Sequence, residues 1–109
     1  MAKIPTSAQR DRVRKTAPAL VAYTEGVLYG DLWERPGLSK RDRSLITVAA
    51  LVATYRPEQL ETHIGRALDN GVTRDEIAEL VTHLAFYAGW PAGMTGASVA
   101  TNVFEKRDV

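Results

Sequence analysis

The segment from Thr73 to Pro91 constrains the fold of this chain more than any other stretch, because both of its ends and its buried face can be read from the residues. Thr73 is followed three residues later by Glu76, which is the spacing of a capping box at the start of a helix. Gly89 in a left-handed conformation would end that helix, and Pro91 would bar its continuation. Between these ends one apolar stripe recurs at helical spacing: Ile77, Leu80, Val81, Leu84, Ala85 and Ala88. The sequence therefore predicts an amphipathic helix over residues 74–88.

The same start and stop signals predict four further helices. Proline is tolerated in the first turn of a helix, and serine caps a helix start well. The predicted helices are residues 17–29, begun by Pro18 and ended by Gly30; 40–54, capped by Ser39; 57–69, begun by Pro57; and 91–104, begun by Pro91. No period-two alternation is sustained anywhere, so no strand is predicted. We expect an all-α, single-domain bundle of about five to six helices over residues 18–109, preceded by a basic segment over residues 1–17.

Two of these helices carry further structural expectations. The helix over residues 40–54 is apolar nearly all round, so we expect it to be the central helix, buried on most sides. The last helix carries small residues, Gly93 and Gly96 among them, which let a neighbouring helix approach closely. Its core face is predicted to contain Met94, Ala97, Thr101 and Phe104.

Composition limits the classes of function. The chain of 109 residues has 45% hydrophobic residues and 25% charged residues, which is typical of one soluble globular domain. A chain this short buries only about two-thirds of its unfolded surface, so self-association is expected. A net charge of +1 gives no general attraction for nucleic acid or acidic membranes. No apolar run approaches the roughly 20 residues that span a bilayer, and a cytoplasmic location is expected.

Histidine, tyrosine and carboxylate side chains are the candidates for chemistry. Glu79, His83 and Tyr87 follow one another at intervals of four, so they lie along one line of their helix. His63 borders the apolar stripe of another helix, where it is either a hydrogen-bonded boundary residue or a catalyst. The two histidines lack the spacing that would place two metal ligands on one helix face, so no metal site is predicted.

Several separated motifs, in order, resemble the carboxymuconolactone decarboxylase family, which also includes alkyl hydroperoxidase D-like proteins. The motifs are YGDLWERPGLSKRDRSLITVAALVA, the histidine of LETHIGRAL, the turn DNGVT and the run HLAFYAGWPAG. The resemblance covers residues 28–104 and implies a helical bundle that forms a trimer or a hexamer. The peroxidase branch of the family needs two cysteines, and this chain has none. A dithiol peroxidase cycle is therefore excluded.

The resemblance to the decarboxylase branch implies an enzyme that converts 4-carboxymuconolactone to 3-oxoadipate enol-lactone and CO2 in aromatic catabolism, without a cofactor. When CO2 departs, the electrons of the broken bond can pass through the ring double bond into the lactone carbonyl. On this reading His63, His83 and Tyr87 are the catalytic candidates, and Arg43, Trp90 and Glu61 are the substrate-binding candidates. Two alternatives remain open: related chemistry on another small lactone or oxo-acid, and a non-catalytic role as a small-molecule-binding or assembly protein.

Overall fold

The computed structural model describes residues 8–109, and helices dominate this range. It contains six α-helices and no strand, which confirms the predicted all-α class. None of the helices in residues 8–109 combines the length and the hydropathy needed to cross a bilayer. The chain packs as two compact units, divided between Leu38 and Ser39.

The first unit contains α1 (Ala8–Arg14), α2 (Pro18–Tyr23), the π-helical segment η1 (Thr24–Tyr29) and the 3-10 turn η2 (Leu32–Glu34). Pro18 begins α2 and Gly30 caps η1, as predicted from the sequence. Arg14 joins α1 to η1 by two hydrogen bonds to Glu25, of 2.9 and 2.8 Å. Residues 1–7 of the predicted basic segment lie outside the described residues.

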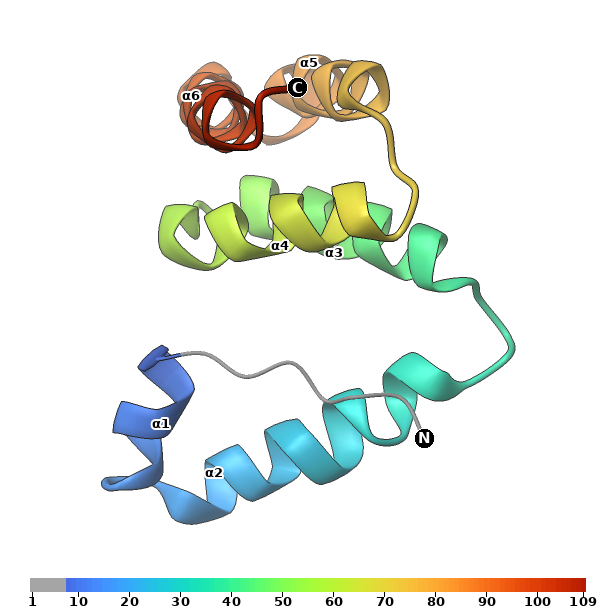
Figure 1. The fold of residues 1–109 in the computed structure, drawn as a ribbon. Coiled ribbons are helices and arrows are strands. Elements are labelled where there is room, and N and C mark those ends of the chain that lie inside the picture. Colours follow the sequence, from blue (N-terminus) through green and yellow to red (C-terminus); the bar gives the residue numbers. More distant parts are fainter. Residues whose placement is uncertain (1–7) are drawn as a thin grey trace. The chain divides into compact units, whose positions relative to one another are not determined.

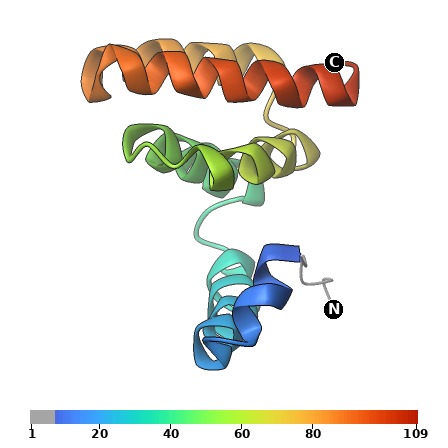
Figure 2. The same cartoon turned by 90° about the vertical axis from the view of Figure 1, so that its left-hand side faces the viewer.

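The second unit contains α3 (Lys40–Ala53), α4 (Pro57–Asp69), α5 (Arg74–Ala88) and α6 (Trp90–Arg107). Figures 1 and 2 show that α3 and α4 form one layer and that α5 and α6 form the other. The predicted caps are present, since Ser39 accepts a hydrogen bond from the Asp42 amide and Thr73 forms a full capping box with Glu76. The side chains between the layers make one core: Val48, Val52, Leu60, Ile64, Ala67, Val72, Ile77, Val81, Ala100, Val103 and Phe104.

The junction between α5 and α6 differs from the prediction. Gly89 has φ 110° and ψ 145°, which is not the left-handed helical conformation expected of it. Trp90 then begins α6 immediately, and Pro91 lies in the first turn of that helix. The chain therefore reverses at a single residue, Gly89. Glycine is needed there because an L-residue would be strained at this φ.

The buried face of α6 was also predicted wrongly in part. Phe104 is buried as expected, but Met94 is 62% exposed and Thr101 is exposed. Close packing of small residues sets the observed face, because a Cβ on Gly93 would stand 2.7 Å from the Cβ of Ala85 on α5. The glycines thus fix which side of α6 meets α5, as their spacing indicated.

The helix α3 is less buried than its apolar sequence predicts. Val48 and Val52 are fully buried, but Ile46 is 56% exposed and Ala50 is exposed. Neighbouring helices of the unit cover α3 along the line of Ser44, Val48 and Val52. The prediction that α3 is buried on most sides is therefore wrong, because one side of this helix is exposed.

Candidate active site

The two flanks of α4 carry different chemistry. On one flank, Glu61 accepts a hydrogen bond of 2.7 Å from Lys106, and Asp69 accepts one of 2.7 Å from Arg107, so this flank is bound to α6. On the other flank lie His63, Arg66 and Asn70, which share one side of the helix because they are three to seven residues apart. Glu61, predicted as a substrate-binding residue, is thus on the opposite flank from His63.

His63 is half-buried beside a positive charge. Burial of the imidazole and, second, the charge of Arg66 one turn away lower the pKa of His63 from 6.5 to about 4. Glu61 does not raise this pKa, because it faces α6 and pairs with Lys106. A pKa this low keeps the His63 imidazole neutral at neutral pH, and Arg66 supplies a positive charge beside it.

Arg43 and Thr47 lie one turn apart on α3, the helix that forms a layer with α4. The Thr47 hydroxyl donates to the Arg43 carbonyl at 2.8 Å, which places the two residues on one side of α3. Asn70, which caps the end of α4, donates a hydrogen bond of 2.9 Å to the hydroxyl of buried Ser44 and so joins the end of α4 to the start of α3. We call this region the α3/α4 seam, defined by Arg43, Thr47, His63 and Arg66.

Positions along the seam follow from helix geometry. Arg66 is one turn from His63, about 5 Å along the axis of α4, whereas Asn70 is two turns away, at about 10 Å. Arg43 adjoins Ser44 and therefore belongs to the Asn70 end of the seam. Arg66 is thus the cation on the same face of α4 as His63, and Arg43 on α3 is level with the Asn70 end of that helix.

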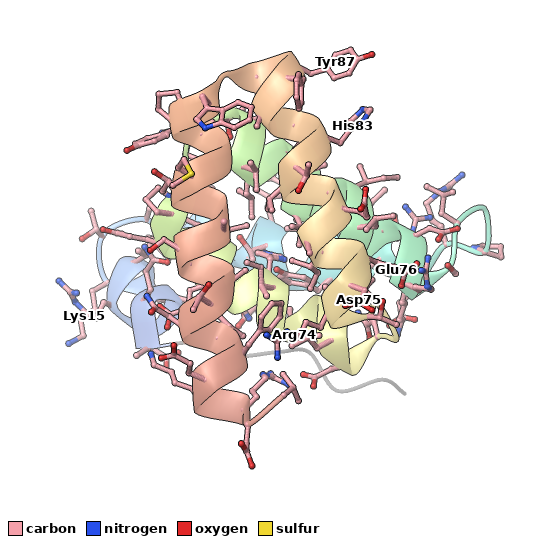
Figure 3. The ribbon with its side chains drawn as sticks, turned by 90° about the horizontal axis from the view of Figure 1, so that it is seen from above. Lys15, Arg74, Asp75, Glu76, His83 and Tyr87 are labelled. Carbon is pink, nitrogen blue, oxygen red and sulfur yellow. The ribbon has the colours of Figure 1, made fainter. Side chains whose placement is uncertain are left out.

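His83 lies in a different place, in an open groove between α3 and α5. We call this the α3/α5 groove; its volume is about 630 Å³. Figure 3 shows His83 and Tyr87 projecting from the side of α5 that also carries Asp75 and Glu76. The rings of His83 and Tyr87 stack with their centroids 4.7 Å apart, which agrees with the prediction that the two residues lie along one line of the helix. The groove is lined by Leu45, Ile46, Ala49, Asp75, Glu76, Glu79, Leu80, His83 and Leu84.

Trp90, the last substrate-binding candidate, lies at the corner between α5 and α6. Its ring makes an edge-to-face contact with Phe86 at 5.4 Å, and both rings are exposed. Neither ring lines the α3/α5 groove. The structure thus divides the sequence candidates. His63 lies on α4 and Arg43 on the neighbouring α3, His83 and Tyr87 lie together on α5, and Trp90 and Glu61 lie elsewhere.

Sequence reasoning missed Arg66. No motif marks it, but its position three residues after His63 places both on one helix face, and that spacing was a usable signal. Within residues 8–109, no three histidine, aspartate or glutamate side chains are grouped closely enough to hold a metal ion.

Comparison with known proteins adds independent information. Residues 18–102 match the model of the carboxymuconolactone decarboxylase family. The chain is 43% identical over 77 residues to a 4-carboxymuconolactone decarboxylase from Acinetobacter baylyi, covering 71% of this chain and 58% of that protein. It is 37% identical over 86 residues to the nitrosuccinic acid decarboxylase npaB of Metarhizium robertsii, covering 79% and 59%. An uncharacterized 15.0 kDa protein of Paracoccus denitrificans is 28% identical over 98 residues, covering 88% and 73%. The chain thus spans less than two-thirds of the length of the first two relatives.

Proposed function

The chain belongs to the carboxymuconolactone decarboxylase family, and from this premise we propose that it decarboxylates a small dicarboxylic acid at the α3/α4 seam without an organic cofactor. One observation supports this place above the others. A half-buried, neutral histidine lies one turn from a cation that attracts an anion, and a bound anion favours protonation of the ring, which can then act as an acid.

The names of two relatives suggest the class of substrate. Both 4-carboxymuconolactone and nitrosuccinic acid are dicarboxylic acids in which a leaving carboxylate is joined to a group that accepts electrons. In the lactone that group is the conjugated carbonyl, and in the nitro acid it is the nitro group. We propose a dianion with a built-in electron sink as the substrate of this chain, with 4-carboxymuconolactone as the first candidate.

The cations of the seam have the role of binding this dianion. An arginine guanidinium suits a carboxylate, because it offers a planar pair of donors and a permanent charge. Arg66 is one turn from His63, so it is the nearer anchor for the carboxylate that the product retains. Arg43 lies farther along the seam and adds positive potential there.

His63 has the role of proton donor to carbon. Bound negative charge favours the imidazolium, so the dianion raises the pKa of His63 and the ring takes up a proton from solvent. The bond to the leaving carboxylate then breaks, CO2 departs, and the electron pair passes into the electron sink. His63 returns its proton to the resulting carbanion, so each turnover consumes one proton and releases one CO2.

The test compares the two histidines on candidate substrates. CO2 release from 4-carboxymuconolactone and from nitrosuccinate is measured for the unmodified protein, His63→Gln and His83→Gln, after circular dichroism has shown that each variant is folded. We expect His63→Gln to lower kcat by ~10²–10⁴, the range for a positioned acid or base, and His83→Gln to stay within a few-fold. A folded His63→Gln variant with unchanged turnover would reject the assignment, and absence of turnover with both acids would reject this substrate class.

A further inference from the structure

The α3/α5 groove is not used by the proposed reaction, and its floor is apolar. Leu45, Ile46 and Ala49 on α3 and Leu80 and Leu84 on α5 supply the floor. Ile46 is exposed, whereas the other four are partly buried. Apolar side chains left partly uncovered in a groove of about 630 Å³ are typical of a surface that another molecule covers. A molecule that binds in the groove is therefore expected to contact it with apolar side chains.

The rim of the groove is negatively charged. Asp75, Glu76 and Glu79 all stand on α5 beside the groove. Glu76 is bound by Arg41 and by the Thr73 amide, whereas Asp75 and Glu79 form no ion pair within residues 8–109. Two such grooves facing each other would bring like charges together, which disfavours a two-fold contact of the groove with itself. The occupant must instead be a different surface, apolar with positive charge beside it.

The first unit of this same chain presents such a surface. Leu20, Tyr23 and Val27 are 59%, 67% and 52% exposed. Their spacing of three, four and seven places them on one face of the helix formed by α2 and η1, which is the anchor pattern of a helix that binds in a groove. Buried Val21 and the ion-paired Glu25 lie on the side of this helix that packs against α1.

Positive charge accompanies this apolar stripe. Arg12 and Lys15 lie at the end of α1 and in the turn before α2, where both are exposed. Neither forms an ion pair among the residues that the structure describes. Two cations thus precede the stripe of Leu20, Tyr23 and Val27 in the sequence, and they equal in number the two carboxylates of the groove that form no ion pair within residues 8–109.

We propose that the α3/α5 groove binds the α2–η1 stripe of a second copy of this chain, with Arg12 and Lys15 placed against Asp75 and Glu79. The contact is heterologous, since it joins two different surfaces, and such contacts close into a ring when the rotation between copies permits. It is independent of the reaction proposed for the seam.

The absence of cysteine from the chain permits a clean cross-linking test. Ala49→Cys places one thiol in the groove, and Ala19→Cys places one beside the stripe, each in place of a small residue. The two single-cysteine proteins are mixed and oxidised, and the mixed disulfide is quantified by mass spectrometry. We expect it to exceed the disulfide between Ala19→Cys and the control Ser98→Cys, on exposed α6, by about 10-fold or more, since a docked thiol has a high effective concentration. Equal yields with Ala49→Cys and Ser98→Cys would overturn the proposal.

Charge reversal tests the same contact without a cross-link. Light scattering over a range of concentrations is applied to the unmodified protein, Glu79→Lys, the double variant Glu79→Lys with Lys15→Glu, and the control Glu105→Lys. We expect Glu79→Lys to raise the dissociation constant by about 10-fold or more, the double variant to restore it, and Glu105→Lys to leave it unchanged. A monomeric unmodified protein, an oligomer insensitive to Glu79→Lys, or a failure of Lys15→Glu to restore assembly would each overturn the proposal.

Discussion

His63 and His83 belong to the same four-helix unit, yet the charges around them have opposite signs. His63 is half-buried on α4, one turn from Arg66 and on the same seam as Arg43. His83 lines an open groove that it shares with Asp75, Glu76 and Glu79. The two imidazoles are chemically identical, so the difference between them lies in what each would attract.

The size of the effect decides which histidine suits an anionic substrate. A pair of unit charges 4 Å apart interacts by about 1 kcal/mol in water and about 4 kcal/mol near a protein surface. A dianion is therefore attracted beside Arg66 and repelled in the groove that carries Asp75 and Glu79. The residue type is the same for both histidines, so it does not indicate the sign of the charge around each ring.

The largest expected effect among tests of this comparison comes from removing the cation nearest to His63. Arg66→Gln keeps hydrogen-bond donors but loses the charge, and hydrogen bonds to charged groups contribute roughly 1.5–3 kcal/mol. We expect KM for a dicarboxylate substrate to rise about 10–100-fold, with a smaller change in kcat. Steady-state kinetics on the folded variant measures both constants.

Arg43→Gln is the matched control, because it removes an arginine from the farther end of the same seam. We expect a smaller rise in KM than for Arg66→Gln. A larger effect at Arg43 would move the carboxylate anchor to α3, where the sequence first suggested it.

An intermediate effect is expected in the dependence of stability on pH. The pKa of His63 is about 4 in the folded chain and about 6.5 when unfolded, so between these values the unfolded state binds more protons. Stability from this residue is complete above pH 6.5 and is lost as the pH falls towards 4. Because the ring is partly exposed, water screens the effect. We therefore expect His63 to contribute about 1 kcal/mol to the free energy of unfolding, which corresponds to a shift in Tm of roughly 4–8 °C.

Thermal unfolding of the unmodified protein and of His63→Gln, at steps from pH 7 to pH 4, isolates this contribution. The unmodified protein should lose more Tm than the variant over this range. Parallel losses in the two proteins would show that His63 titrates normally in the folded chain, and would remove the basis for a neutral ring beside Arg66.

Local signals predicted the helices well, and packing decided what they missed. Ser39, Thr73, Pro18 and Pro57 mark helix starts through bonds and dihedral preferences within one turn, so their effect could be read from the sequence. The exposed side of α3 could not be read, because Ile46 is apolar whether or not another helix covers it. The face of α6 was misassigned because hydrophobicity favoured Met94, while the close approach of Ala85 to Gly93 set the packing.

The candidate site shows the same limit. His63 and Arg43 were chosen by residue type and by resemblance, and His83 and Tyr87 by spacing along one helix. Which of them share a region depends on the hydrogen bond from Asn70 to Ser44 and on the ion pairs that hold the other flank of α4. These contacts join residues 26 to 45 positions apart, beyond the reach of local patterns.

The smallest expected effect comes from Gly65→Ala, next to Arg66 in sequence but on the α6 flank of α4. An added Cβ would stand 2.8 Å from Arg107 Nη2, and this flexible side chain can shift while its exposed pair with Asp69 loosens. We expect a loss of stability within about 1 kcal/mol, as for an exposed ion pair, and kcat within two-fold of the unmodified value. A large fall in kcat with unchanged Tm would show that the two flanks of α4 are not functionally separate.

The most direct test of the account is an NMR titration of the two histidine rings with and without succinate, an unreactive dicarboxylate. The chain has only two histidines, so His83→Gln assigns both sets of signals. We predict a pKa near 4 for His63 in the free protein, a rise in that pKa when succinate is added, and unchanged signals from His83. Signals of His83 that respond to succinate while the pKa of His63 stays fixed would contradict the assignment of the anion site to the α3/α4 seam.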